Sequence, residues 1–207
     1  MIAVRGLSHT YADGTQALTG VSFSLAAGEV VSLTGPMGSG KSTLLRHLNG
    51  LLRPSRGQVW IEGCDSSALR VAQLSRRVAV AFQEPDHQLF KTSVRDEIAF
   101  AAAGQDRLEL VLDWLGLGAV VNRHPLDLGY SRRKLVAIAA VVAMGTPIVV
   151  LDEPAAGQDR AGLQMLLSLL ARLREEGRTV VFAGHRRELS DVADRRLRLD
   201  SGRLTCG

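Results

Sequence analysis

The sequence predicts an α/β fold built on a largely parallel sheet. Short apolar runs alternate with helical patterns through most of the chain, and crossover helices between parallel strands produce such an alternation. The 207 residues are 46% hydrophobic and 22% charged, enough for one domain with a substantial core. Residues 88–128 show only helical periodicity. We therefore expect a single domain over residues 1–207, with a helical lobe at about 88–145 set into the α/β core.

The first part of the chain favours strands. Apolar runs bounded by turn residues predict strands at Ile2–Val4, Val21–Leu25, Gly57–Glu62 and Val78–Phe82. A buried strand with Val30, Val31 and Leu33 precedes a glycine turn, after which Leu44, Leu45 and Leu48 indicate a helix.

The lobe is predicted from two apolar helix faces. Val94, Ile98 and Ala101 form one face, and Ser93 with Asp96 resembles a capping box at its start. The other face consists of Leu108, Val111, Leu112 and Leu115.

After the lobe, strands and helices alternate again. We expect strands at Ile148–Leu151, Thr179–Phe182 and finally Arg196–Leu199, where the chain completes its fold. The helices between them are predicted at Ser131–Met144, Leu163–Glu176 and Glu188–Ala193.

The turn after the third strand carries the strongest chemical signal. It fits the phosphate-binding pattern G-x-x-x-x-G-K-[ST] with the residues Gly35, Pro36, Met37, Gly38, Ser39, Gly40, Lys41 and Ser42. Its glycines let successive N–H groups and a helix N-terminus face a polyphosphate. Lys41 is expected to reach the β- and γ-phosphates and the Ser42 hydroxyl to complete a Mg²⁺ shell. A chance match arises in roughly one chain of this length in a hundred, so we predict nucleotide binding.

Polar residues also follow the later strands. Asp152 and Glu153 end a buried apolar strand, at the sheet edge where α/β proteins bind ligands. Asp152 can hold Mg²⁺ through water, and Glu153 can polarise an attacking water. His185 is expected to sense the γ-phosphate, and Gln83 to bind both the metal and the water. Taken singly, each of these residues also has a purely structural interpretation. The two carboxylates, for example, could form a polar turn before Pro154.

The composition limits which classes of partner we expect and where in the cell the protein would act. The net charge of +4 comes almost wholly from arginine, and basic clusters lie at 132–134, 186–187 and 195–198. We interpret each cluster as a solvated face, with attraction to an anionic membrane surface or nucleic acid as the alternative. With 4% aromatics and none between these clusters, base stacking and hence nucleic-acid binding are not expected. Cys64 and Cys206 form no disulfide framework, which suits a reducing cytosol. No apolar stretch is long enough to span a bilayer. A protein serving a membrane would therefore act from its cytoplasmic side.

Along its whole length the chain resembles the nucleotide-binding subunits of ABC transporters. The resemblance is carried, in the family's order, by the phosphate loop at 35–42, Gln83, the Asp152-Glu153 pair, the loop at 156–159 and His185. Tyr11 stands where the family places a ring that stacks on adenine. The segment 82–90, with Val94 and Ala99-Phe100 behind it, is similar to the energy-coupling-factor branch, whose ATPases drive uptake of vitamins and of cobalt or nickel ions.

This resemblance implies a fold and a set of site residues. The fold is a P-loop NTPase core with a largely parallel sheet, an N-terminal antiparallel β subdomain and an inserted helical lobe. ATP and Mg²⁺ are the implied cofactors. The nucleotide contacts are Tyr11, the loop from Gly35 to Thr43 and Asp152, and the metal contacts are Ser42, Gln83 and Asp152. Glu153, His185 and Gln83 are the implied catalytic residues.

One segment departs from the family. The signature Leu-Ser-Gly-Gly-Gln, which closes over ATP held by a second subunit, is replaced by Leu128, Gly129, Tyr130, Ser131 and Arg132. Gly129, Ser131 and Arg132, with Asp159, are the expected contacts to the partner's site. Tyr130 removes a small residue from a place where backbone approaches phosphate. Full ATPase activity of a homodimer is therefore in question.

The resemblance implies an ATP hydrolase that powers import of a micronutrient. Its partners would be a second ATP-binding subunit, identical or paralogous, and a transmembrane subunit whose coupling helix enters a groove near residues 83–90. The protein would be peripheral, on the cytoplasmic side. One alternative is a soluble ABC-type ATPase in DNA repair, translation or iron–sulfur assembly, although the chain lacks the long coiled coil or tandem repeat of such proteins. A small-molecule kinase would need an acceptor site that nothing in the sequence supplies.

Overall fold

The central sheet is built from strands that are apolar on both faces. β7 (Ile148–Asp152) and β8 (Thr179–Ala183) are buried at every position, as parallel strands covered on both sides must be. The sheet order is β10-β9-β3-β8-β7-β6, and the strands from β9 to β6 run parallel. The remaining strands are β3 (Val30–Thr34), β6 (Val78–Ala81), β9 (Arg195–Asp200) and β10 (Arg203–Thr205).

Alternate residues of these strands enter two separate cores, because successive side chains point to opposite faces of a sheet. Val149 and Leu151 pack with the apolar residues of the helices on one face. Ile148 and Val150 pack with those of α1 (Lys41–Leu48) and the N-terminal strands on the other.

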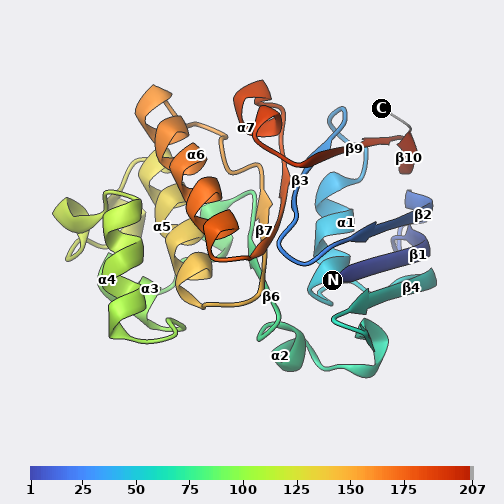
Figure 1. The fold of residues 1–207 in the computed structure, drawn as a ribbon, viewed down its shortest axis with the longest axis horizontal. Coiled ribbons are helices and arrows are strands. Elements are labelled where there is room, and N and C mark those ends of the chain that lie inside the picture. Colours follow the sequence, from blue (N-terminus) through green and yellow to red (C-terminus); the bar gives the residue numbers. More distant parts are fainter. Residues whose placement is uncertain (206–207) are drawn as a thin grey trace.

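A second, antiparallel sheet covers α1. Its order is β2-β1-β4-β5, formed by β1 (Ile2–Thr10), β2 (Gln16–Leu25), β4 (Arg56–Ile61) and β5 (Cys64–Asp65). The computed structural model, which describes residues 1–205, places α1 between the two sheets, with β1, β2 and β4 at one end of the molecule (Figure 1). Cys206 lies outside the described residues. The sheet makes β1 and β2 much longer than the short strands predicted from their apolar runs.

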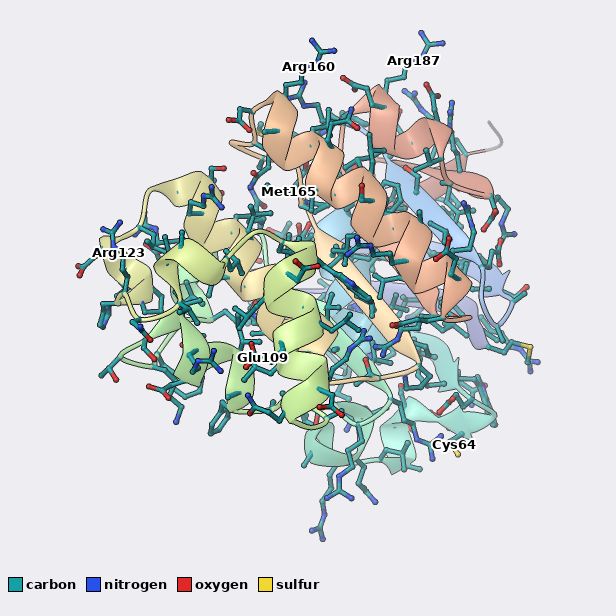
Figure 2. All side chains as sticks on the ribbon, turned by 60° about the vertical axis from the view of Figure 1, so that its left-hand side comes forward. Cys64, Glu109, Arg123, Arg160, Met165 and Arg187 are labelled. Atoms are coloured by element: carbon teal, nitrogen blue, oxygen red, sulfur yellow. The ribbon has the colours of Figure 1, made fainter. Side chains whose placement is uncertain are left out.

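The opposite end of the molecule is helical (Figure 1). It contains α3 (Val94–Ala99), α4 (Gln105–Trp114), α5 (Tyr130–Ala143) and α6 (Arg160–Glu175). The predicted cap of α3 is confirmed, since the Ser93 hydroxyl accepts a hydrogen bond from the Asp96 N–H at 3.1 Å. Placing Ala101 on the α3 face was wrong: the helix ends before it and Ala101 is exposed. Figure 2 shows Arg160 and Arg187 extending outward from the first residues of α6 and α7 (Arg187–Asp191).

The end of the fold also differs from the prediction. The chain does not complete its sheet at Leu199, because β10 pairs antiparallel with β9 through a two-residue turn. Ser201 and Gly202 both have positive φ, +46° and +74°, as a tight hairpin requires. One further short helix was not predicted, α2 (Val71–Leu74). Single turns of 3₁₀ helix lie at Ser66–Ala68, Pro85–His87, Gly118–Val120 and Pro125–Asp127.

Parallel pairing brings the predicted polar residues to one edge. The carboxyl ends of β3, β6, β7 and β8 point the same way, so the segments that follow them are neighbours. β6 and β7 are adjacent, which places Gln83 beside the Asp152-Glu153 pair although they lie far apart in the sequence. Among residues 1–205 no helix has the length and apolar character needed to cross a membrane.

Candidate active site

A cavity of about 520 Å³ lies at this edge of the sheet. Most of the residues predicted to contact a nucleotide line it together. They are Tyr11, the phosphate-loop residues Met37, Gly38, Ser39, Gly40, Lys41, Ser42 and Thr43, and then Gln83, Glu153 and His185. Gly35 and Pro36 line a separate, smaller hollow that also includes His185. Most of the predicted residues thus surround a single space, while Asp152 lines neither hollow.

Two loop glycines are required by their backbone and their neighbours. Gly35 has φ +146° and a side chain there would approach the Leu199 carbonyl oxygen to 2.0 Å. Gly40 has φ +99°, and a Cβ would come within 2.6 Å of the Ala17 carbonyl oxygen. Neither position accepts an L-residue without moving main chain. The loop is therefore held tightly against β2 and β9, beside the cavity that it lines.

Lys41 begins α1 and bends back over the loop. Its ammonium donates to the carbonyl oxygens of Gly35 at 2.9 Å and Pro36 at 3.0 Å. The side chain is 7% exposed and lines the cavity, so its charge is available to a bound anion. The N-terminus of an eight-residue helix lies at the same point. Helix N–H groups and a lysine together form a strong site for an anion such as a polyphosphate.

Asp152 is a buried carboxylate suited to a metal ion. Its Oδ1 is buried and has no hydrogen-bond partner. Burial raises the pKa of Asp152, while the Ser42 hydroxyl beside it and the Lys134 charge act in the opposite direction. Within residues 1–205 no cluster of three His, Cys, Asp or Glu could hold a metal by itself. Mg²⁺ usually takes one or two protein ligands and the rest from phosphates and water, so Asp152 and Ser42 fit it.

Glu153 has an unusual backbone conformation. Its φ is +47°, a left-handed value that costs a non-glycine residue about 1–3 kcal/mol and that recurs at active sites as well as in turns. The carboxylate lies 3.3 Å from Nε2 of His185 and faces the cavity. The carboxylate passes close to Gly184, where a Cβ would lie 3.5 Å from Glu153 Oε2, an ordinary van der Waals contact. A carboxylate and an imidazole thus meet at the cavity wall.

Tyr11 and Gln83 both line the cavity. The Tyr11 hydroxyl is 2.9 Å from the Thr43 hydroxyl, and its ring packs edge-on against His9. These contacts fix the ring beside the phosphate loop, where stacking on a base remains a prediction. Gln83 is exposed, and only its carbonyl is bound, by Lys134 and Tyr130. Its side-chain amide is therefore available to a ligand.

Lys134 was missed by the sequence analysis. It belongs to the cluster Arg132-Arg133-Lys134, interpreted as a solvated face, yet Lys134 is fully buried. Burial lowers the pKa of Lys134 to about 8, against the attraction of Asp152, Glu84 and Glu153. The available signal was its position one residue before the apolar run that begins at Leu135, on the buried side of α5.

The residues expected to contact a partner's nucleotide lie away from the cavity. Gly129 precedes α5 as its N-cap, and Asp159 caps α6 by accepting the Gly162 N–H at 2.8 Å. Ser131 donates its hydroxyl to Gln158 Oε1 at 2.8 Å. The Arg132 guanidinium donates to the Gly116 carbonyl at 3.0 Å. Both side chains are thus engaged within their own chain.

Tyr130 fills the space between this segment and the loop at 156–159. A Cβ on Gly157 would lie 2.7 Å from the Tyr130 ring, and the Tyr130 hydroxyl donates weakly to the Gln83 carbonyl at 3.4 Å. The aromatic ring is therefore part of the surface that the start of α5 presents.

Comparison with known proteins identifies relatives of the whole chain. The family model for the ABC transporter matches residues 18–156. The energy-coupling factor transporter ATP-binding protein EcfA of Methanothermobacter thermautotrophicus is 39% identical, over 99% of this chain and 69% of that protein.

Two solved structures share the fold. One is a dimeric ATP-binding cassette in a post-hydrolysis state bound to ADP and Pi, with a TM-score of 0.91, 26% identity and coverage of 100% of this chain and 97% of the other. The second is cbiO1 of Clostridium perfringens, part of the ABC transporter complex cbiONQ, with a TM-score of 0.85, 31% identity and coverage of 99% and 86%.

Proposed function

This chain belongs to the ABC transporter family as an ATP-binding subunit of the energy-coupling-factor type, and we propose that it hydrolyses ATP to drive import of a micronutrient, a vitamin or a cobalt or nickel ion. The observation that carries the proposal is the single cavity in which the phosphate loop, Gln83, Glu153 and His185 meet. Residues 1–207 act as one nucleotide-binding domain, with the helical lobe at about 88–145. A relative captured with ADP and Pi supports hydrolysis as the reaction.

The residues divide the chemistry among them. The loop N–H groups and Lys41 bind the β- and γ-phosphates, and the Tyr11 ring stacks on adenine. Glu153 accepts a proton from the attacking water, while His185 orients its carboxylate and contacts the γ-phosphate. Ser42, Asp152 and the Gln83 amide would hold Mg²⁺, which offsets the charge of the transferring phosphoryl group.

The proposed partners are a second ATP-binding subunit and a transmembrane subunit. The dimeric relative bound to ADP and Pi and the membership of cbiO1 in a transporter complex support both. A second hollow of about 320 Å³ lies between the central sheet and the lobe. Its rim carries Phe90 and Phe100, which are 63% and 62% exposed. We assign this apolar groove to a coupling helix, which would keep the protein peripheral on the cytoplasmic side of the membrane.

The replacement of Glu153 by glutamine tests this function. Glu153→Gln keeps the size of the side chain but cannot accept the proton, so turnover is expected to fall by about 10²–10⁴ while ATP still binds. The ATP-bound protein should then accumulate as a trapped dimer, which size-exclusion chromatography with analysis of bound nucleotide would detect. Glu188→Gln, on the exposed first turn of α7, is the control and should hydrolyse ATP normally. Normal turnover in Glu153→Gln would show that another group is the base.

A further inference from the structure

Lys134 joins two strand ends of the active site through one side chain. Its ammonium donates to the carbonyl oxygens of Phe82 at 3.0 Å and Asp152 at 2.9 Å, and also to that of Gln83. An ammonium has three N–H groups, and a fully buried one is costly unless each finds an acceptor. The bonds connect α5 to the segment after β6, which carries Gln83, and to the last residue of β7, which directly precedes Glu153.

The bond to Asp152 fixes the peptide unit that precedes Glu153. The carbonyl of that unit accepts from Lys134, and its N–H, on Glu153, donates to the Ala183 carbonyl at 3.0 Å. With both ends bonded the peptide cannot rotate freely. This matters because Glu153 has φ +47°, a conformation that persists only where the surroundings impose it.

Neighbouring residues at the start of α5 do not share this arrangement. Arg133 forms an ion pair with Asp86 at 3.2 Å, and Tyr130 reaches only the Gln83 carbonyl. Lys134 contacts the backbone behind the cavity and does not line it. Its removal would leave the nucleotide contacts in place but release the peptide that aims the Glu153 carboxylate.

We propose that Lys134 is a positioning residue for ATP hydrolysis, which holds the Asp152–Glu153 peptide and the Gln83 carbonyl in the arrangement that directs Glu153 at the attacking water. The inference rests on the proposed role of Glu153 as the base. A misplacement of a catalytic group by 1 Å costs about a hundredfold in rate. Loss of Lys134 therefore lowers kcat, whereas ATP affinity and KM stay as in the unmodified protein.

The test compares Lys134→Met with Lys134→Arg and Arg133→Met in the full chain. Single-turnover hydrolysis of labelled ATP with excess protein and Mg²⁺ gives the rate, and calorimetry gives the affinity. Lys134→Met should lose about a hundredfold in rate with unchanged affinity. Lys134→Arg, which keeps a cation and several donors, should recover part of the rate. Arg133→Met removes the same charge one residue away and should hydrolyse normally.

Two outcomes would overturn the inference. One is a normal rate in Lys134→Met. The other is a loss of rate matched by an equal loss of affinity and of thermal stability, which a purely structural lysine would give. Should Lys134→Met not fold, Lys134→Gln keeps two amide donors and is expected to show an intermediate rate with unchanged affinity. A normal rate in that variant would likewise contradict the inference.

A double-mutant comparison separates this inference from the proposed function. Because Lys134 acts through Glu153, adding Lys134→Met to Glu153→Gln should lower the residual rate little further. If Glu153→Gln alone hydrolyses ATP normally, the assigned base is wrong. If Glu153→Gln is inactive and Lys134→Met is normal, only the role of Lys134 fails. Full additivity of the two losses would also contradict it.

Discussion

The phosphate loop and the start of α5 differ in where their polar groups are directed. The loop faces an open cavity, and Ser39 Oγ and Asp152 Oδ1 beside it are buried without partners. At the start of α5, by contrast, Ser131 and Arg132 already donate hydrogen bonds within the chain. The chain is thus prepared to bind its own nucleotide, whereas contact with a partner's nucleotide would first require those bonds to break. Three of the four predictions that follow test this difference, and the fourth concerns the stability of the fold.

Lys41→Ala should have the largest effect, and the effect is on binding of nucleotide at the phosphate loop. The variant loses charge-assisted bonds to two phosphates, so ATP affinity is expected to fall about a hundredfold or more. Isothermal titration calorimetry with ATP and Mg²⁺ measures it. Lys91→Ala is the matched control, because Lys91 lies over Phe90 and Phe100 and away from the cavity. Unchanged affinity in Lys41→Ala would refute the assignment of the loop.

Restoring the family's signature tests the second region of this comparison, the start of α5. In a dimer, the signature segment of each subunit closes over the ATP that the other subunit holds. We expect the isolated homodimer to be a poor ATPase, since the altered segment would close both of its ATP sites. The combined changes Gly129→Ser, Tyr130→Gly, Ser131→Gly and Arg132→Gln should raise turnover by about a hundredfold. Steady-state phosphate release measures this effect.

The signature experiment needs a stability control, because Tyr130 packs near Gly157 and Ser131 bonds Gln158. Thermal unfolding of the combined variant provides it. An isolated wild type that is already fast, and that does not improve when the segment is rebuilt, would mean that Ser131 and Arg132 replace the usual contacts. A clear gain would instead favour natural pairing with a paralogue that carries the full signature.

Tyr11→Ala should have a moderate effect. Loss of stacking on adenine is expected to weaken ATP binding by about 1–3 kcal/mol. Tyr11→Phe is the informative control, because it keeps the ring but loses the hydroxyl bond to Thr43 at 2.9 Å. Affinity should fall in Tyr11→Ala alone. An equal loss in both variants would assign the effect to the hydroxyl, and no loss in either would make Tyr11 a surface residue of the first strands.

The smallest predicted effect is on stability and concerns His47 beneath the loop. Burial lowers the pKa of His47, helped by the nearby His9, so the folded protein takes up this proton at a lower pH than the unfolded chain does. As the pH falls below about 6.5, the unfolded chain takes up the proton first, and stability is lost. The melting temperature should therefore drop less steeply with acidification in His47→Leu than in the wild type. His87→Gln, at an exposed position, should keep the wild-type slope.

The sequence alone predicted the nucleotide site because its parts are local. The phosphate loop occupies eight consecutive residues, and Asp152 and Glu153 directly end an apolar strand. Strands and helices from residue 130 onward were likewise predicted within a few residues of their bounds, since their apolar periodicity is strong. Only β10, whose three residues carry no such pattern, was absent from that prediction.

Only the tertiary structure decided how distant segments meet. The adjacency of β6 and β7 places Gln83 next to Asp152, and no local pattern states that strand order. The burial of Lys134 depends on carbonyls 51 and 18 residues away in the chain. A lysine in a basic cluster normally lies in water, and it is buried here because those two strand ends satisfy its ammonium. The residues that carry the chemistry can be identified from their neighbours in the sequence. Their positions relative to one another are set by contacts that only the folded chain brings together.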